Sequence, residues 1–327
     1  MDPAARLPDL LGHQEAQTLK KITVIGEILV EIMADLPGHG FMEPIALTGP
    51  FPSGAPAIFA AQAARLGQPC GMISCVGADD FGRLNLDRLA ADGVDVSAIA
   101  IHPDLPTGTA FVRYRPDGSR DFVFNIRHSA CGATSLDAAA NAVLRGTDHL
   151  HVMGTSLFSS DLLQANLSAI DLVKSQGGSL SFDPNLRPEL LAAPGMAKAM
   201  TDILSQCDVF LPSGPELTLL THAQDEAGAV AELLARGPKV VVHKRGSAGA
   251  AYFDRDRSLL QPGFPVTEVD PTGAGDCFGA AFVSLWLRGA DPADSLRLAC
   301  AAGALAVTRR GPMEGAGTLT DLWALAR

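Results

Sequence analysis

The stretch VDPTGAGDCFG, residues 269–279, leads directly into an apolar segment of small residues from Ala280 to Leu287. The apolar segment predicts a buried helix, and the glycines in front of it allow several backbone amides to converge at the helix N-terminus. Such a junction favours an anion, because unpaired amides and the helix dipole both attract negative charge. Asp276 would lie in the first turn, where a carboxylate can also act as an ordinary helix cap. Taken whole, the stretch favours a phosphate site.

Two familiar glycine loops do not fit this stretch. A Walker A loop requires a Lys-Ser or Lys-Thr pair after its glycines, and no such pair follows them here. A dinucleotide fingerprint would place its third glycine one residue before Gly279 and would lie between two strands, whereas helical sequence follows this loop. A nicotinamide oxidoreductase therefore stays only as a distant alternative.

Short apolar runs alternate with helical stretches along most of the chain. The runs predict buried strands at 22–26, 71–76, 149–153, 180–183, 209–211 and 239–242. The stretches between them predict helices at 56–66, 79–91, 136–145 and 161–176, the last with Gln164 in capping-box position after Asp161. This alternation predicts an α/β fold, a doubly wound and mostly parallel sheet covered by helices on both faces.

Two segments break the alternation. Residues 33–52 are rich in glycine and proline, and residues 109–114 and 121–125 read as two strands joined by a turn at 116–119. A hairpin does not easily join a central parallel sheet, so the two segments, about 33–52 and 105–128, predict a small β appendage that acts as a lid. An edge hairpin without a role is the open alternative.

Composition limits the classes of function. The chain has 327 residues, 47% of them hydrophobic, and a net charge of −11, which disfavours nucleic acid and anionic membranes as partners. Its six cysteines form no C-x-x-C pair, and no apolar run is long enough for a membrane helix. We expect a soluble cytoplasmic protein with a polar leader at 1–21 and one domain at 22–327. The pair His149 and His151 has no evident third metal ligand and reads as structural.

Residues 270–276 resemble the C-terminal signature of the ribokinase-like (PfkB) carbohydrate kinases. Three further stretches are similar to that family: PSGAPA at 52–57 with the alanine-rich helix after it, VGADDFG at 76–82, and VTRRG at 307–311. The resemblance runs from about residue 22 to the end. It implies a doubly wound α/β domain with a β-sheet lid, and direct transfer of the γ-phosphoryl group of ATP to a sugar hydroxyl.

The resemblance also implies roles for single residues. Asp276 would be the catalytic base, and the amides of Gly273, Ala274 and Gly275 would form the anion hole. The stretch HKRGSAG at 243–249 resembles the family's nucleotide-phosphate loop. The implied nucleotide-binding residues are therefore Lys244, Gly246, Ser247, Gly249, Thr272, Gly273 and Gly275.

Metal sites follow from the same resemblance. Glu216 matches the Glu of the family's Asn-x-x-Glu motif, which orders Mg²⁺ through water, although Ser213 replaces the Asn. Asp270 and Thr272 occupy positions that hold a monovalent cation in several relatives, which raises the option of K⁺. On their own, Glu216 and Lys244 would read as a first-turn helix charge and a solvated turn.

The sugar site is expected at residues from several segments. Glu27 and Glu31 are expected on the first strand, and paired acceptors of this kind suit a polyol. The run DPNLR at 183–187 resembles fructokinases and 2-keto-3-deoxygluconate kinases, and Ile58 replaces a substrate-contacting Asn, which disfavours ribose. Arginines of the lid are candidates for a substrate carboxylate. The full set of expected sugar-binding residues is Glu31, Ser53, Gly54, Ala55, Arg113, Arg127, Asn185, Arg187 and Asp276.

The sequence thus predicts a kinase for 2-keto-3-deoxygluconate or a ketohexose such as tagatose or fructose, with ATP and Mg²⁺ as cofactors. A nucleoside kinase of the same fold and a non-catalytic sugar-binding regulator are the remaining alternatives. Lids with exposed strand edges often pair between subunits, so a homodimer through the lid is expected.

Overall fold

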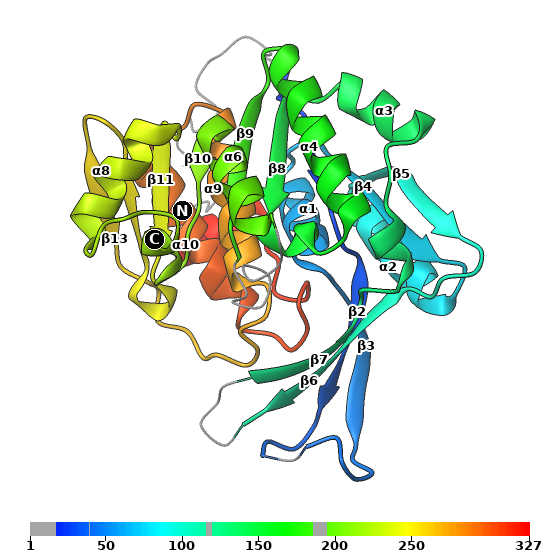
Figure 1. Cartoon of the computed structure of the whole chain (residues 1–327). Helices are drawn as coiled ribbons and strands as arrows, with labels where there is room; N and C mark the ends of the chain where they lie inside the picture. Colours follow the sequence, from blue (N-terminus) through cyan, green and yellow to red (C-terminus); the bar gives the residue numbers. More distant parts are fainter. Residues whose placement is uncertain (1–17, 39, 116–119, 186–194) are drawn as a thin grey trace.

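The computed structural model describes residues 18–38, 40–115, 120–185 and 195–327. A nine-stranded sheet forms its centre (Figure 1). From one edge to the other its strands are β13 (Ser258–Gln261), β12 (Ala250–Phe253), β11 (Val240–Lys244), β10 (Val209–Phe210), β9 (Ser179–Asp183), β8 (His149–Met153), β1 (Ile22–Ile25), β4 (Cys70–Gly77) and β5 (Asp95–His102). Neighbouring strands from β11 to β5 pair in parallel, and β12 and β13 pair antiparallel. The six strands predicted from the sequence are confirmed.

Helices cover both faces of this sheet, as predicted. They are α1 (Ala55–Arg65), α2 (Asp80–Ala91), α3 (Ala138–Arg145), α4 (Ser160–Ser175), α6 (Met196–Gln206), α7 (Glu216–Leu219), α8 (Glu226–Arg236), α9 (Ala274–Leu287), α10 (Pro292–Ala306) and α11 (Leu319–Leu325). Neighbouring strand residues such as Val24 and Ile25 belong to two different core clusters, because successive side chains of a strand point to opposite faces. Both faces of the sheet are therefore buried.

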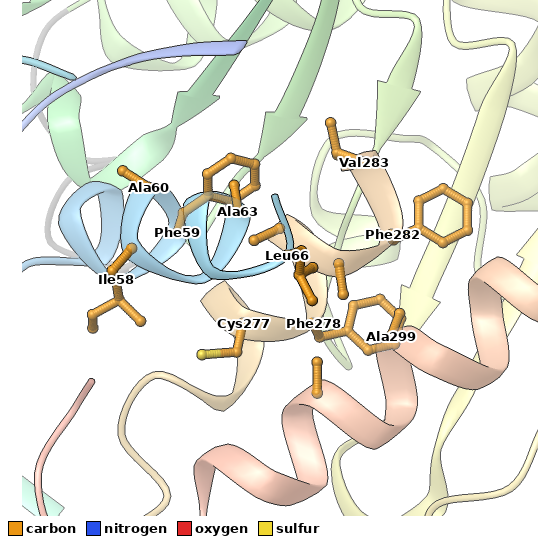
Figure 2. Packing of buried hydrophobic residues seen from close by; sticks show 14 of the residues in the cluster. Ile58, Phe59, Ala60, Ala63, Leu66, Cys277, Phe278, Phe282, Val283 and Ala299 are labelled. Carbon is orange, nitrogen blue, oxygen red and sulfur yellow. The ribbon is translucent and has the colours of Figure 1, made fainter. Parts of the chain in front are cut away.

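The larger core packs α1, α9 and α10 against the sheet. Figure 2 shows α1, which carries Ala60 and Ala63, lying alongside α9, which carries Phe278 and Phe282; all four residues belong to one core cluster. Small residues on these helices allow close approach, and the phenyl rings fill the space between them and the sheet. This packing fixes the start of α9, the helix that the glycine-rich stretch was predicted to open.

The capping of α4 differs from the prediction. The helix begins at Ser160, and the side chain of Ser159 accepts a hydrogen bond from the Leu162 amide. A capping box starting at Asp161 is therefore wrong, because a serine two residues earlier is the first residue that can accept from the helix amides.

A second sheet of four strands projects from the body at the bottom of Figure 1. Its order is β3 (Leu47–Ser53), β2 (Leu29–Ala34), β6 (Gly108–Tyr114) and β7 (Arg120–Asn125). It confirms the predicted β appendage, while the turn predicted at 116–119 lies outside the described residues. The expectation that Glu27 and Glu31 lie on the first strand is wrong. β1 ends at Ile25, Glu27 lies in the link that follows, and Glu31 belongs to β2.

Across the described residues, no helix combines the length and the hydrophobicity that crossing a bilayer requires.

Candidate active site

Two cavities meet at the N-terminus of α9. The first, which we call the lid cavity, has a volume of about 750 Å³ and lies between the second sheet and the body. Its lining includes Glu27, Glu31, Ser53, Gly54, Ala55 and Ile58 from the body and β2–β3, Arg120, Phe122, Phe124 and Arg127 from the hairpin, and Thr272, Gly273, Gly275 and Asp276. The second, the glycine-loop cavity, has a volume of about 800 Å³. Its lining includes Gly246, Ser247, Gly249, Phe264, Ala274, Gly275 and Phe278.

Four residues line both cavities and so mark the place where they join: Ser213, Lys244, Pro271 and Gly275. The predicted phosphate loop thus lies between two spaces that are each large enough for a small ligand. A group held at this junction can be passed from one cavity to the other.

The chain enters α9 through a glycine that no other residue could replace without strain. Gly273 has φ 82°, and a Cβ there would lie 2.5 Å from the carbonyl oxygen of Pro312. Within the described ranges, no side-chain hydrogen bond caps this first turn. Its amides are therefore available to a ligand, as the loop sequence predicted.

Asp276 lies in the first turn of α9 and lines the lid cavity with only 7% of its surface exposed. It does not cap the helix, because Gly273 is the N-cap residue and no side chain accepts there. Burial raises the pKa of Asp276 to about 8; the charge of Asp183 adds to the rise, and the ammonium of Lys244 opposes it. A buried carboxyl with such a pKa is typical of a proton-transfer site.

Lys244 and Asp183 form a buried ion pair beside Asp276. The pair arises because β9 and β11 end at the same edge of the sheet, and each residue is the last of its strand. A Cβ built on Gly275 would lie 3.5 Å from Nζ of Lys244, so the ammonium is next to the glycine loop. The sequence predicted Lys244 near a phosphate chain and missed Asp183 as its partner.

The floor of the lid cavity carries two buried carboxylates, each bonded to a serine. Ser53 Oγ donates to Glu31 Oε1 at 2.7 Å, and Ser156 Oγ donates to Glu27 Oε2 at 2.8 Å. Ser53 was predicted at this site, whereas Ser156 and its neighbour Thr155, which also lines the cavity, were not. No sequence pattern pointed to the short 3₁₀ turn that carries them.

The lid cavity is lined by one arginine that the sequence did not single out and by one of the two that it did. Arg113 lies opposite Asp121 in the β6–β7 register and forms an ion pair with it at 2.9 Å; Asp121 lines the lid cavity and Arg113 does not. Arg120 does line it, and donates to Thr272 Oγ1 at 2.5 Å. Arg127 lines the cavity as predicted.

Asp270 is fully enclosed at the entrance to α9. Its Oδ1 accepts from the amide and the hydroxyl of Thr272 at 3.0 and 2.8 Å, and its Oδ2 accepts from the Gly311 amide at 3.0 Å. The guanidinium of Arg120 lies 4.0 Å from Oδ1. The two predicted signatures at 270–276 and 307–311 therefore meet at this carboxylate.

Glu216 begins α7 behind the junction of the two cavities. Its Oε2 accepts from the Ser213 amide at 2.6 Å, and Ser213 itself lines both cavities. Glu216 itself is not among the residues that line either cavity.

Three remaining predictions are placed as follows. Asn185 lines the lid cavity with φ 36°, a left-handed conformation that Asn tolerates better than most residues. Arg187 lies outside the described residues.

His149 and His151 are buried on β8 and bonded to Ser179 and Ser181; burial lowers the pKa of His149 to about 3. Over the described ranges, no group of three His, Cys, Asp or Glu residues could hold a metal.

Comparisons with known proteins find relatives over nearly the whole chain. The family model described as pfkB family carbohydrate kinase matches residues 19–318. A 2-dehydro-3-deoxygluconokinase of Thermoproteus tenax is 32% identical over 93% of this chain and 93% of its own length.

Two solved structures are similar over nearly the whole chain. An E. coli protein provisionally named ribokinase II, in complex with ATP and Mg²⁺, is 48% identical with a TM-score of 0.90, covering 94% of this chain and 99% of that one. A Vibrio cholerae O395 fructokinase double mutant, in a form with bound fructose, ADP and potassium ion, is 27% identical with a TM-score of 0.81. The match covers 96% of this chain and all of that one.

Proposed function

This chain belongs to the pfkB family of carbohydrate kinases and is an ATP-dependent sugar kinase, and we propose that Asp276 is the general base that takes the proton from the acceptor hydroxyl. The observation that carries the proposal is the position of Asp276. It lines the lid cavity one residue after Gly275, which lines both cavities, and it lies in the first turn of α9, which no described side chain caps.

The two cavities suit the two substrates of a direct transfer. We place ATP in the glycine-loop cavity with its γ-phosphoryl group at the junction, and the sugar in the lid cavity. The acceptor oxygen attacks the γ-phosphorus, the bond to the β–γ bridging oxygen breaks, and Asp276 accepts the proton. The amides of Gly273, Ala274 and Gly275 hold the charge of the transferring group, which is the main requirement of phosphoryl transfer.

Lys244 is proposed to act on the phosphate chain from the junction. Its ammonium is paired with Asp183 and lies beside Gly275, so a phosphate oxygen can compete with Asp183 for it. Gly246, Ser247 and Gly249 line the glycine-loop cavity and are proposed to contact the nucleotide.

Glu216 and Ser213 fit Mg²⁺, because this ion binds through one or two carboxylates and substrate phosphates and retains several waters. Bound Mg²⁺ would neutralise charge on the phosphates. Glu216 would hold it through water, and Ser213 would present its hydroxyl at the junction in place of the amide of the usual Asn.

For the acceptor we propose a six-carbon keto-sugar acid of the 2-keto-3-deoxygluconate type. Glu27, Glu31 and Ser53 supply acceptors for its hydroxyl groups on the floor of the lid cavity. Arg127 supplies a cation on the lid side, where a carboxylate would lie. Asn185 lies at the same cavity and is proposed to contact the sugar.

A nucleoside is the second candidate acceptor. Phe122 and Phe124 of β7 stack with centroids 5.1 Å apart and line the lid cavity, and aromatic faces of this kind can bind a base.

An ATP-consumption screen separates these candidates. We expect 2-keto-3-deoxygluconate to give the highest kcat/KM, with fructose and tagatose lower and ribose and adenosine lowest. Preference for adenosine would favour the nucleoside kinase. Binding of ATP with no turnover on any acceptor would favour a non-catalytic regulator, and binding of NADH in place of ATP would favour an oxidoreductase.

We also propose K⁺ as an activator next to Asp270 and Thr272. These residues offer carboxylate and hydroxyl oxygens, and the similar Vibrio fructokinase contains a potassium ion. An ion there would share Asp270 with the guanidinium of Arg120. Replacing K⁺ by tetramethylammonium at constant ionic strength should lower kcat, and an unchanged kcat would remove K⁺ from the account.

The outer face of the lid is the proposed contact of a homodimer. It carries a groove of about 400 Å³ lined by Phe41, Glu43, Pro44, Ile45, Leu47, Phe111, Val123 and Asn125. Val123 is 50% exposed and Leu47 is 41% exposed, and β3 and β7 are the outer strands of the sheet. A second copy of this lid would cover both the apolar groove and a strand edge.

The six cysteines are all free thiols, which supports the cytoplasm as the location.

A further inference from the structure

The stretch VGADDFG at 76–82 contributes nothing to the lining of either cavity, although it matches the family signature. The first of its two aspartates, Asp79, instead binds Thr107, the residue from which the lid hairpin starts. Oδ2 of Asp79 accepts from the Thr107 amide at 2.8 Å, and Oδ1 accepts from the Thr107 hydroxyl at 2.7 Å. Strand β6 begins at the next residue, Gly108.

Asp79 is itself held in place by the body. It is the N-cap of α2, and its Oδ1 accepts from the Gly82 amide at 2.8 Å. The hydroxyl of Thr107 completes the network by accepting from the Gly77 amide at 2.9 Å while it donates to Asp79. Partial burial acts to raise the pKa of Asp79, but the donors of Thr107 and Gly82 outweigh it and keep the pKa below its usual range.

The space around this network leaves no room for adjustment. A Cβ on Gly77 would lie 2.6 Å from the Thr107 nitrogen and 2.6 Å from Oδ2 of Asp79. The returning end of the hairpin is fixed at the same point, because the Ala130 amide donates to the Pro106 carbonyl at 2.8 Å. Both ends of the hairpin therefore leave the body from one anchored position.

The hairpin carries the lid side of the lid cavity. Arg120, Phe122 and Phe124 lie on one face of β7, since alternate residues of a strand share a face, and Arg127 follows the strand. The angle at which the hairpin leaves Thr107 determines how far these side chains reach over the floor.

We propose that Asp79 and Thr107 form the fixed pivot of the lid hairpin, and that this pivot sets the position at which Arg120 and Arg127 meet the acceptor. Asp79 is thus a positioning residue for the reaction, and this inference rests on the proposed sugar kinase activity. A displacement of about 1 Å in a group that positions a substrate can lower a rate about 100-fold, so the pivot affects catalysis without touching the reacting atoms.

The main test replaces Thr107 by Val, which keeps the shape and removes the hydroxyl, and by Ser, which keeps the hydroxyl. A second variant, Asp79→Asn, leaves an NH₂ group facing one of the three donors. The matched control is Asp137→Ala, which removes the aspartate that caps α3 by accepting from the Ala140 amide, away from the hairpin.

Two measurements apply to each variant. Hydrogen exchange of the β6 and β7 amides reports the anchoring directly, and needs neither substrate. Steady-state kinetics with MgATP and 2-keto-3-deoxygluconate or fructose gives KM for each substrate, and the ratio of ADP to sugar phosphate. That ratio exceeds one when water replaces the sugar hydroxyl as acceptor and ATP is split to ADP and phosphate.

For Thr107→Val we expect exchange in β6 and β7 to be about tenfold faster, KM for the sugar to rise about tenfold, and the ADP ratio to rise, with KM for ATP nearly unchanged. Thr107→Ser and Asp137→Ala should retain wild-type values for all of these. If Thr107→Val has the wild-type rate of hydrogen exchange in β6 and β7 and the wild-type ratio of ADP to sugar phosphate, the pivot is overturned. This holds whatever the melting temperature of the variant. If no sugar is phosphorylated even by the wild type, the proposed function fails, while the exchange data still test the pivot.

Discussion

Asp276 is a carboxyl group whose surroundings disfavour its charged form. Burial is the largest cause, the negative charge of Asp183 is the next, and Lys244 acts in the opposite direction. The residue that is proposed to accept a proton therefore holds one itself at neutral pH in a large part of the molecules, and the proton must leave before the reaction starts.

The raised pKa of Asp276 predicts how the activity depends on pH. Because kcat/KM reports the ionisation of the free enzyme, it should rise about tenfold per pH unit below a pKa of about 8 and level off above it. Initial rates at low sugar concentration between pH 5.5 and 9.5 measure this profile. A profile that is flat from pH 6 to 8 would contradict a general base with the pKa of Asp276.

The burial of Asp276 also predicts that the free energy of unfolding falls as this carboxyl becomes charged. The pKa of Asp276 in the folded state is above the ordinary value of 3.8, so the folded state binds the extra proton. Stability from this group is therefore present below pH 4, is lost as the pH rises toward 8, and stays lost above it. Asp276→Asn should raise Tm by about 3–6 °C at pH 8 and hardly at all at pH 4, as measured by calorimetry. A lower Tm than that of the wild type at pH 8 would show that the charged form is stabilised in the fold.

At the scale of single residues, the sequence predicted those site residues that belong to short, recognisable motifs. The glycine loop, Asp276, Lys244 and Ser53 each lie in a stretch with a recognisable pattern, and all of them line the two cavities. The sequence could not predict that Asp183 pairs with Lys244 or that Ser156 bonds to Glu27. Those contacts join residues 61 and 129 positions apart, so only the sheet order brings them together.

At the scale of elements, the β6–β7 hairpin shows how register decides which side chain faces the site. Arg113 and Asp121 lie opposite each other in the hairpin, and the ion pair between them uses the guanidinium that was expected to meet a substrate. Arg120, the neighbour of Asp121 on β7, lines the lid cavity, whereas Arg113 does not. A shift of one residue changes the face of a strand, and the sequence predicted the strands without their register.

Arg127 lines the lid cavity and Arg113 does not, so the two arginines give a matched test of whether the substrate is an acid. Arg127→Ala should raise KM for 2-keto-3-deoxygluconate about tenfold or more and change KM for fructose less than twofold, because only the acid presents a carboxylate to the guanidinium. Arg113→Ala removes an arginine that pairs with Asp121 and should leave both values near wild type. Equal responses of the two sugars to Arg127→Ala would end the carboxylate assignment.

The six strands of the central sheet that the sequence predicted are almost entirely buried and read as continuous apolar runs. β13, at the edge of the central sheet, was not predicted. It has the burial pattern exposed, intermediate, exposed, intermediate, and so it offers no such run. β5, at the other edge, mixes polar and apolar residues in the same way. Edge strands depend on contacts with one neighbour only, which sequence pattern does not record.

At the scale of the whole molecule, the lid has an inner face for the substrate and an outer face for a second subunit. Val123→Lys places a charge in the outer groove and should shift the protein from dimer to monomer in light scattering after size exclusion. Leu260→Lys is the control, since Leu260 is 65% exposed on β13, at the edge of the central sheet and far from both lid segments in sequence. A wild type that is monomeric at micromolar concentration, or a Val123→Lys dimer, would remove the lid as the interface.

The central claim is that Asp276 takes the proton while the amides of its own helix turn hold the phosphoryl group. The most direct measurement compares kcat and the dissociation constant for ATP in wild type and in Asp276→Asn, with Asp161→Asn as the control because Asp161 lies in the first turn of α4 and outside both cavities. We predict that Asp276→Asn lowers kcat at least about 100-fold and leaves ATP binding within about twofold, while Asp161→Asn changes neither. A folded Asp276→Asn protein that turns over at the wild-type rate would contradict the account.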